Sequence, residues 1–202
     1  MPKGPIAVVL VLAGVFATGA GLGRTSGDSW SGWLASRNER PAARATPPAR
    51  PSQPVRITIE SIGVVAPVHP VGLAPDGSIA VPDVHRHNET GWYDGGPVPG
   101  ETGPAIIVGH VDTRTGPSVF YRLRSVQPGS RVVVTRADSS EVTFEITSVE
   151  YFDKGNLPVE RVYGDYSRPG LRLITCGGRW LGGSIGYSDN VVAFASLVGA
   201  AP

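Results

Sequence analysis

The sequence predicts an all-β domain, either a closed barrel or a sandwich, with short helices confined to its loops. Three observations support this class. Short runs of alternating or β-branched residues recur along residues 55–202, turn residues separate these runs, and no segment beyond residue 23 shows a sustained helical stripe of apolar side chains. Roughly 140 residues in seven or eight short strands fit either architecture.

An uncharged apolar run at residues 6–22 follows Lys3 near the start of the chain. As a helix it would be about 26 Å long, just short of a ~30 Å hydrocarbon core. An uncleaved membrane anchor, a cleaved signal peptide and a buried helix all fit this run, and the small residues at 17–23 offer a loose cleavage site. We expect residues 1–23 to act as a single-pass anchor in the cell membrane, or to direct secretion if they are removed, with the remaining chain extracytoplasmic.

Residues 24–54 have the composition of a flexible, disordered linker. They contain five arginines, two acidic residues and five prolines, with almost no periodic apolar pattern. The domain at residues 55–202 has a different charge balance, with twelve basic and fifteen acidic residues from Arg56 onward. A domain with this acidic excess is a poor match for nucleic acid, so no nucleic-acid partner is expected.

The predicted strands of this domain are short, and turn residues such as Pro75-Asp76-Gly77 and Pro128-Gly129 lie between them. Two of the strands, joined at residues 137–140, are expected to form a hairpin. The runs with strand character are Arg56–Glu60, Ser78–Val81, Ala105–Gly109, Arg131–Arg136, Glu141–Tyr151, Leu171–Thr175 and Val191–Leu197.

Cys176 is the only cysteine of the chain, and an unpaired thiol in an exported protein needs an explanation. It is a buried small hydrophobe, half of an intermolecular disulfide, or a reactive nucleophile. The run Leu171–Thr175 ends at this cysteine and is followed by Gly177 and Gly178. A thiol at a strand end beside glycines favours the nucleophile, because a peptide backbone can approach closely there.

A nucleophilic thiol needs a proton acceptor, and imidazole has the most suitable pKa. His110 follows the run Ala105–Gly109 and so has the same strand-end position as Cys176. Asp112, two residues later, is either a residue that orients this imidazole or a turn-forming aspartate that bonds its own backbone. His85 and His87 alternate in a polar stretch, but no third ligand is spaced for a metal, so no metal site is expected.

Several motifs together resemble the sortases, most closely the class F group of high-GC Gram-positive bacteria. His110 stands in VGHVDT, Cys176 in LITCGG, and a final strand-like run NVVAFA begins at Asn190, all behind an apolar segment and a proline-rich linker. The resemblance covers roughly residues 55–198. The tetrapeptide TCGG alone would be a weak signal, whereas its combination with GHVD 66 residues upstream is a strong one.

The resemblance implies a closed β-barrel of about eight strands and an extracytoplasmic cysteine transpeptidase. Such an enzyme cleaves an LPXTG-like sorting signal on secreted proteins between Thr and Gly. Cys176 would attack the Thr carbonyl to form a thioester, and His110 would protonate the leaving amine and deprotonate the incoming one. The acceptor would be an amine, such as one on a peptidoglycan precursor, and no cofactor is expected.

The chain departs from the sortase pattern at one position, because sortases also use an arginine on the final strand. Here the start of that strand reads Tyr187-Ser188-Asp189-Asn190. Asn190 is expected to supply the oxyanion donor instead, with Arg179 as the alternative. Two further readings stay open: a catalytically impaired sortase-like binding or assembly module, and a peptidase that hydrolyses its acyl-enzyme.

Overall fold

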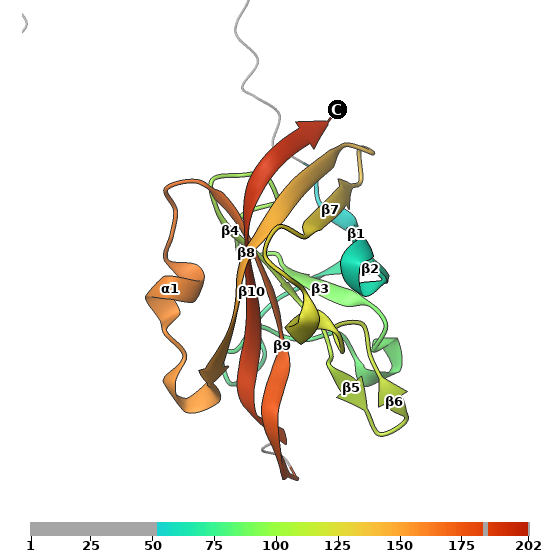
Figure 1. Cartoon of the computed structure of the whole chain (residues 1–202), viewed down its shortest axis with the longest axis vertical. Coiled ribbons are helices and arrows are strands. Elements are labelled where there is room, and N and C mark those ends of the chain that lie inside the picture. The colour runs from blue at the N-terminus through green and yellow to red at the C-terminus, as the bar shows by residue number, and fades with distance from the viewer. Residues whose placement is uncertain (1–51, 184–185, 202) are drawn as a thin grey trace, which may run out of the picture. The chain divides into compact units, whose positions relative to one another are not determined.

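The computed structural model describes residues 52–183 and 186–201 (Figure 1). The predicted anchor at 1–23 and nearly all of the predicted linker at 24–54 lie outside these residues. Within the described ranges, no helix has the length and apolar character needed to cross a membrane. The elements are β1 (Pro54–Ile59), η1 (Glu60–Ile62), β2 (Val64–Val71), η2 (Val84–Arg86), β3 (Thr90–Tyr93), β4 (Gly103–Val108), β5 (Asp112–Thr113), β6 (Gly116–Pro117), η3 (Leu123–Ser125), β7 (Arg131–Arg136), β8 (Glu141–Asp153), η4 (Lys154–Asn156), α1 (Val159–Tyr163), β9 (Pro169–Gly182) and β10 (Gly186–Ala201).

Eight strands close into a barrel in the order β1-β2-β3-β4-β9-β10-β8-β7, and the short strands β5 and β6 form a separate two-stranded sheet. The barrel, and not the sandwich, is therefore the architecture of this all-β domain. Two neighbouring pairs, β2–β3 and β4–β9, run parallel, and the other barrel pairs are antiparallel. A parallel pair brings corresponding strand ends to the same edge of the barrel, which matters for the site described below.

The barrel interior is filled by β-branched and aromatic side chains that alternate with outward-facing residues. On β7 and β8 the alternation is regular, because Val132, Val134, Val142, Phe144 and Ile146 are all buried. Alternation of this kind fixes the register, since a slip by one residue would turn every core side chain outward. The predicted hairpin of these two strands is confirmed, with Val134 opposite Val142.

The strand prediction omits β2, β3 and the short strands β5 and β6, and it includes one segment that is not a strand. Ser78–Val81 is not a strand; its only ladder contact is the isolated bridge between Leu73 and Ile79, within the long β2–β3 connection. Conversely, β2 was not predicted because it contains Pro67 and Pro70, which lack an N–H group. Both prolines are exposed, and Val64, Ala66 and Val68 of the same strand alternate into the core.

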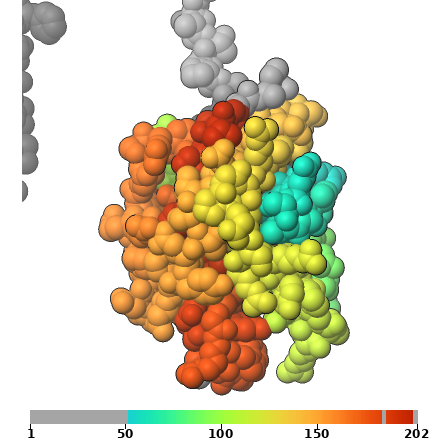
Figure 2. Space-filling model, viewed as in Figure 1, coloured from blue at the N-terminus to red at the C-terminus, as the bar shows by residue number. Residues whose placement is uncertain are grey.

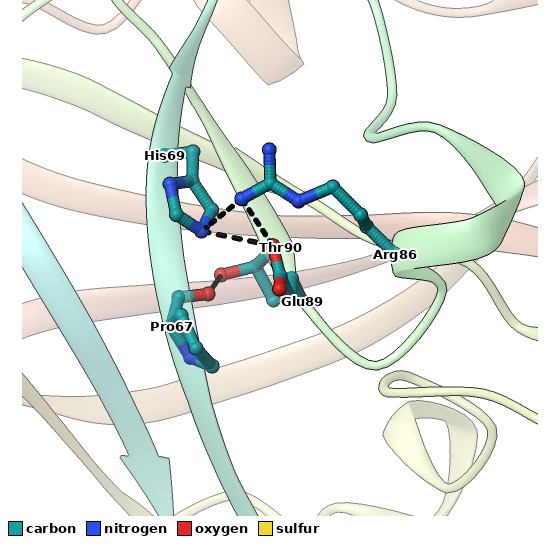
Figure 3. A network of polar contacts seen from close by, with 5 residues as sticks. All are labelled: Pro67, His69, Arg86, Glu89 and Thr90. Atoms are coloured by element: carbon teal, nitrogen blue, oxygen red, sulfur yellow. Dashed lines mark hydrogen bonds and ion pairs between the residues drawn. The ribbon is translucent and has the colours of Figure 1, made fainter.

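The β2–β3 connection is tied back to the barrel by a polar network (Figure 3). The Nε2 atom of His69 on β2 lies 2.9 Å from the Glu89 carboxylate and 2.6 Å from Nη2 of Arg86, and Arg86 in turn pairs with Glu89 at 2.5 Å. The Thr90 hydroxyl donates to the Pro67 carbonyl at 2.9 Å. These contacts hold the C-terminal end of the connection against β2.

A smaller apolar cluster lies on the outer side of the sheet, where the β8–β9 connection passes over it. Val162 of α1 packs there with Val192 and Phe194 of β10. Figure 1 shows α1 to one side of the long strands β8 and β10, and in the space-filling view the orange segment around it forms that flank of the molecule (Figure 2). Helix α1 is too short to be stable alone, so this packing is what holds it.

We predict that Ile107→Ala on β4 lowers the free energy of unfolding by about 2–5 kcal/mol, because it leaves a cavity around a fully buried side chain. Val65→Ala on β2 is the matched control, since that side chain is 65% exposed and should cost little. Urea denaturation of both variants measures the difference. Equal losses for the two variants would contradict the assignment of Ile107 to the core.

Candidate active site

The parallel pairing of β4 with β9 determines where His110 and Cys176 lie. The two strands pair with a constant offset of 66 residues, from Gly103 opposite Pro169 to Val108 opposite Ile174. The alignment continues beyond the last pair, because the Gly109 N–H donates to the Ile174 carbonyl at 3.1 Å and the Thr175 hydroxyl donates to the Gly109 carbonyl at 2.8 Å. The next residues on the two strands are His110 and Cys176, and both line one cavity.

Cys176 is half-buried and unpaired, and it does not belong to the barrel core. Leu171, Leu173 and Thr175 of β9 are buried in the inward direction, so the intervening Cys176 projects from the outer side of the sheet. On its other side, β10 places Asn190 directly opposite it. The thiol therefore lies between the end of β4 and the middle of β10.

The expectation that the strand ends at Cys176 is wrong, because β9 continues to Gly182. Arg179 accordingly lies on this extension of the strand. Gly177 and Gly178 serve the pairing with β10: a Cβ at Gly177 would collide with Val191, and Gly178 has a φ of 75° and lies against Asp189. These glycines leave room for the β10 side chains, so β9 and β10 stay paired beyond Cys176.

His110 is held by one hydrogen bond from its ring. Its Nε2 atom lies 2.7 Å from the carbonyl oxygen of Pro82, in the connection between β2 and β3. A carbonyl oxygen can only accept, so Nε2 carries the hydrogen and a neutral ring keeps its lone pair on Nδ1. Nδ1 is thus the nitrogen available for taking up and releasing a proton.

The cavity that His110 and Cys176 share has a volume of about 890 Å³. Its floor is the outer side of β4 and β9, and its two walls are the β2–β3 and β8–β9 connections. Most of its lining is apolar, which suits an extended peptide with hydrophobic side chains. The lining residues from the floor are Pro104, Ile106, Val108 and Ile174, and those from the walls include Leu73, Ile79, Val81, Leu157, Tyr163 and Tyr166.

The two candidate oxyanion donors are placed differently. Asn190 lines the cavity and is the cross-strand neighbour of Cys176. Arg179 is exposed and is not among the lining residues; its backbone N–H donates to the Ser188 hydroxyl at 2.9 Å. Asn190 therefore shares the cavity with Cys176, whereas Arg179 does not line it.

Asp112 contacts a residue that sequence reasoning did not identify. The hydroxyl of Tyr187, at the start of β10, donates to Asp112 Oδ2, and this hydrogen bond is the main cause that raises the Tyr187 pKa from 10.0 to about 12. The Tyr187 ring packs edge-on against Trp180 at 5.1 Å between centroids. Asp112 therefore links the segment after His110 to the β9–β10 hairpin, and its predicted role in orienting His110 stays a prediction.

His69, His85 and His87 are not among the residues that line this cavity. His87 contacts the Ser118 hydroxyl through Nδ1 at 3.2 Å, and His69 belongs to the network in Figure 3. Across residues 52–183 and 186–201, no group of three His, Cys, Asp or Glu side chains is arranged to hold a metal ion.

The comparison with known proteins identifies one family. The model of the sortase domain matches residues 57–198. Among solved structures, the chain is similar to sortase A from Corynebacterium diphtheriae, with a TM-score of 0.57 and 19% identity over 77% of this chain and 65% of that one. It is also similar to the sortase D5 transpeptidase of Clostridium perfringens, with a TM-score of 0.55 and 21% identity over 73% of this chain and 79% of that one.

Sortase C2 of pilus island 1 from group B Streptococcus is a third similar structure, with a TM-score of 0.55 and 18% identity over 71% of this chain and 73% of that one. These similarities concern the fold. The match spans just under two thirds of the Corynebacterium diphtheriae sortase. No curated protein sequence matches the chain.

We predict that the Tyr187 phenol titrates near pH 12 in the folded protein and returns toward 10.0 in Asp112→Ala, which removes the accepting carboxylate. The stabilisation from this hydrogen bond is present below pH 10 and is lost as the pH rises toward 12, since the unfolded chain releases the phenol proton first. Phenolate absorbance against pH measures the shift. Asp138→Ala, in the β7–β8 turn, is the control, and a Tyr187 pKa that is unchanged in Asp112→Ala would contradict the contact.

Proposed function

We propose that this chain, which belongs to the sortase family of cysteine transpeptidases, is an extracytoplasmic class F enzyme that cleaves an LPXTG-like sorting signal and transfers the acyl group to an amine. The observation that carries the proposal is the position of one thiol and one imidazole at the same cavity, on neighbouring parallel strands. A thiol beside an imidazole is the arrangement that nucleophilic cysteine catalysis requires.

The proposed reaction has two half-reactions. The Cys176 thiolate attacks the Thr carbonyl of the signal, the C–N bond to Gly breaks, and protonated His110 gives its proton to the leaving amine. The incoming amine then attacks the thioester while His110 takes its proton, and the amide product leaves as the thiolate re-forms. One imidazole therefore acts as general acid and then as general base, and Nδ1 is the atom that exchanges the proton.

The cavity supports a peptide substrate with apolar side chains. Ile106 and Val108 on the floor and Tyr163 and Tyr166 on one wall offer surfaces against which the Leu and Pro of a sorting signal can be buried. The thiol and the imidazole belong to the same cavity, so a signal that lies along it presents its Thr carbonyl to them.

Asn190 is proposed to stabilise the negative oxygen of the tetrahedral intermediate. Its side-chain amide is a donor, and it lies across the strand pair from Cys176 within the cavity. In this proposal Asn190 does the work that an arginine does in other sortases, and Arg179 plays no direct part.

The proposal also includes the surroundings of the enzyme. Residues 1–23 would hold it in the cell membrane as a single-pass anchor, and residues 24–54 would let the domain reach secreted substrates and a lipid-linked or wall-precursor amine. Residues 1–51 lie outside the described residues, so these roles rest on the composition of the sequence.

We predict that Cys176→Ala abolishes both peptide cleavage and the acyl-enzyme, because no other thiol exists in the chain. His110→Ala should lower the rate by about 10²–10⁴ through loss of the acid and base. His85→Ala, at an exposed position outside the cavity, should retain the wild-type rate. Turnover of a fluorogenic LPXTG peptide and the mass of the trapped thioester measure these effects.

The same assay, run with and without an amine, separates the possible products. A new amide bond to the added amine identifies transpeptidation, whereas release of the free acid alone identifies a hydrolase. Cleavage by Cys176→Ala at a rate comparable to that of the wild type would contradict the thioester mechanism. A folded wild-type domain that cleaves no peptide would indicate a binding module.

We predict that Asn190→Ala lowers the turnover number by about 10²–10³, the effect expected for loss of one oxyanion donor. Arg179→Ala is the matched comparison and should leave turnover near the wild-type value. Steady-state kinetics with the same peptide measure both, and thermal melting checks that each variant is folded. The reverse pattern, with the loss in Arg179→Ala alone, would assign the oxyanion role to the arginine.

A further inference from the structure

The hydrogen-bonded alignment of β4 with β9 ends just before the imidazole and the thiol. The Gly109 N–H still donates to the Ile174 carbonyl, and the Thr175 hydroxyl to the Gly109 carbonyl. After this point the chain passes from His110 into β5, whereas β9 continues past Cys176 into its hairpin with β10. The distance between the two side chains therefore depends on what joins these two segments beyond the ladder.

The segment after His110 is anchored to the barrel on one side. The Ser118 N–H donates to the Val111 carbonyl and the Phe120 N–H donates to the His110 carbonyl, both at 3.0 Å. Phe120 is fully buried in the core. These contacts fix the segment against its own return strand and the core, but they do not reach β9 or β10.

The contact with the β9–β10 hairpin is made by Asp112. The Tyr187 hydroxyl donates to Asp112 Oδ2, and both side chains are half-buried. Within the described part of the chain, this is the one side-chain hydrogen bond that joins the residues after His110 to the hairpin. It connects β5 with the adjoining ends of β9 and β10 (Figure 1). A hydrogen bond to a carboxylate is about twice as strong as one between neutral groups.

Tyr187 is in turn fixed within the hairpin that carries the thiol. Its ring packs edge-on against Trp180, its cross-strand neighbour, at 5.1 Å between centroids. Farther along the same strand, Asn190 lies opposite Cys176. Neither Tyr187 nor Asp112 is among the residues that line the cavity. The phenol therefore acts on the backbone that carries the thiol, and it leaves the peptide-binding surface free.

We propose that Asp112 and Tyr187 are positioning residues, and that their hydrogen bond is a latch that holds His110 at its working distance from Cys176. The latch joins the two segments at the place where the ladder no longer does so. In this proposal Asp112 orients His110 indirectly, through the phenol of Tyr187. The kinetic consequence rests on the proposed function, whereas the geometric consequence is measurable without any substrate.

The first test is kinetic and uses Tyr187→Phe, which removes the hydroxyl and keeps the ring. We expect kcat for the LPXTG peptide to fall by about 10–100-fold, the scale of a misplacement of about 1 Å. KM should stay near the wild-type value, because the cavity lining is unchanged. Tyr151→Phe, at an exposed tyrosine on β8, is the matched control and should keep wild-type constants. A wild-type kcat in Tyr187→Phe would overturn the proposal.

Variants of Asp112 separate the latch from a direct effect of the carboxylate charge on the imidazole. Asp112→Asn keeps an oxygen that can accept from the phenol, so it should retain most of the kcat, whereas Asp112→Ala should lose as much as Tyr187→Phe. The double variant of Asp112→Ala with Tyr187→Phe should lose no more than either single variant, since both remove the same bond. Equal losses in Asp112→Asn and Asp112→Ala, or additive losses in the double variant, would contradict the latch.

The second test needs no catalysis. In the His110→Cys variant, the equilibrium of a disulfide to Cys176 in a glutathione buffer gives the effective concentration of one thiol at the other. Adding Tyr187→Phe should lower this effective concentration by about ten-fold, and adding Tyr151→Phe should leave it unchanged. Thermal melting checks that each variant is folded.

An effective concentration that Tyr187→Phe leaves unchanged would rule out the latch, whatever the kinetics show. If the wild-type enzyme cleaves no peptide, the proposed function fails, and the disulfide equilibrium still decides whether the latch exists. The two failures are therefore separate results.

Discussion

The parallel pairing of β4 with β9 is the constraint on which the rest of the site depends. Its register brings two residues 66 positions apart to the same level of the barrel, one at the end of β4 and the other midway along β9. No local interaction between His110 and Cys176 is needed for this, because the hydrogen bonds of the ladder and the packed side chains beneath it fix both strands. The sheet thus sets the position of the thiol relative to the imidazole.

The same constraint explains why the cavity lies on the outer side of the sheet. Alternation on β9 sends Leu171, Leu173 and Thr175 into the core, and the residues between them face outward. Two long connections, β2–β3 and β8–β9, then form walls around this outer surface. The first is tied down by the network of His69, Arg86 and Glu89, and the second by the packing of α1 on β10 (Figures 1 and 3).

Much of this arrangement could be predicted from the sequence, and the exceptions have physical causes. The β-branched alternation at 131–136 and 141–151 identifies a real hairpin. The motifs that resemble those of the sortases identify His110 and Cys176, which share the cavity. The continuation of β9 past Cys176 was missed because glycines usually end strands, whereas here they allow close contact with β10. The partner of Asp112 was missed because the phenol of Tyr187 reaches it from 75 residues away.

The register itself can be measured through a cross-link. His110→Cys adds a second thiol two residues beyond the end of β4, at the level of Cys176. Neighbouring strands are about 5 Å apart, within the range of roughly 4.4–6.8 Å between Cα atoms that a disulfide needs. We predict that mild oxidation links this residue to Cys176. It should not link to a cysteine placed one residue earlier, by Thr175→Cys with Cys176→Ala, because that side chain points into the core. Linkage to the Thr175→Cys position, or no linkage at all, would contradict the pairing on which the active site is built.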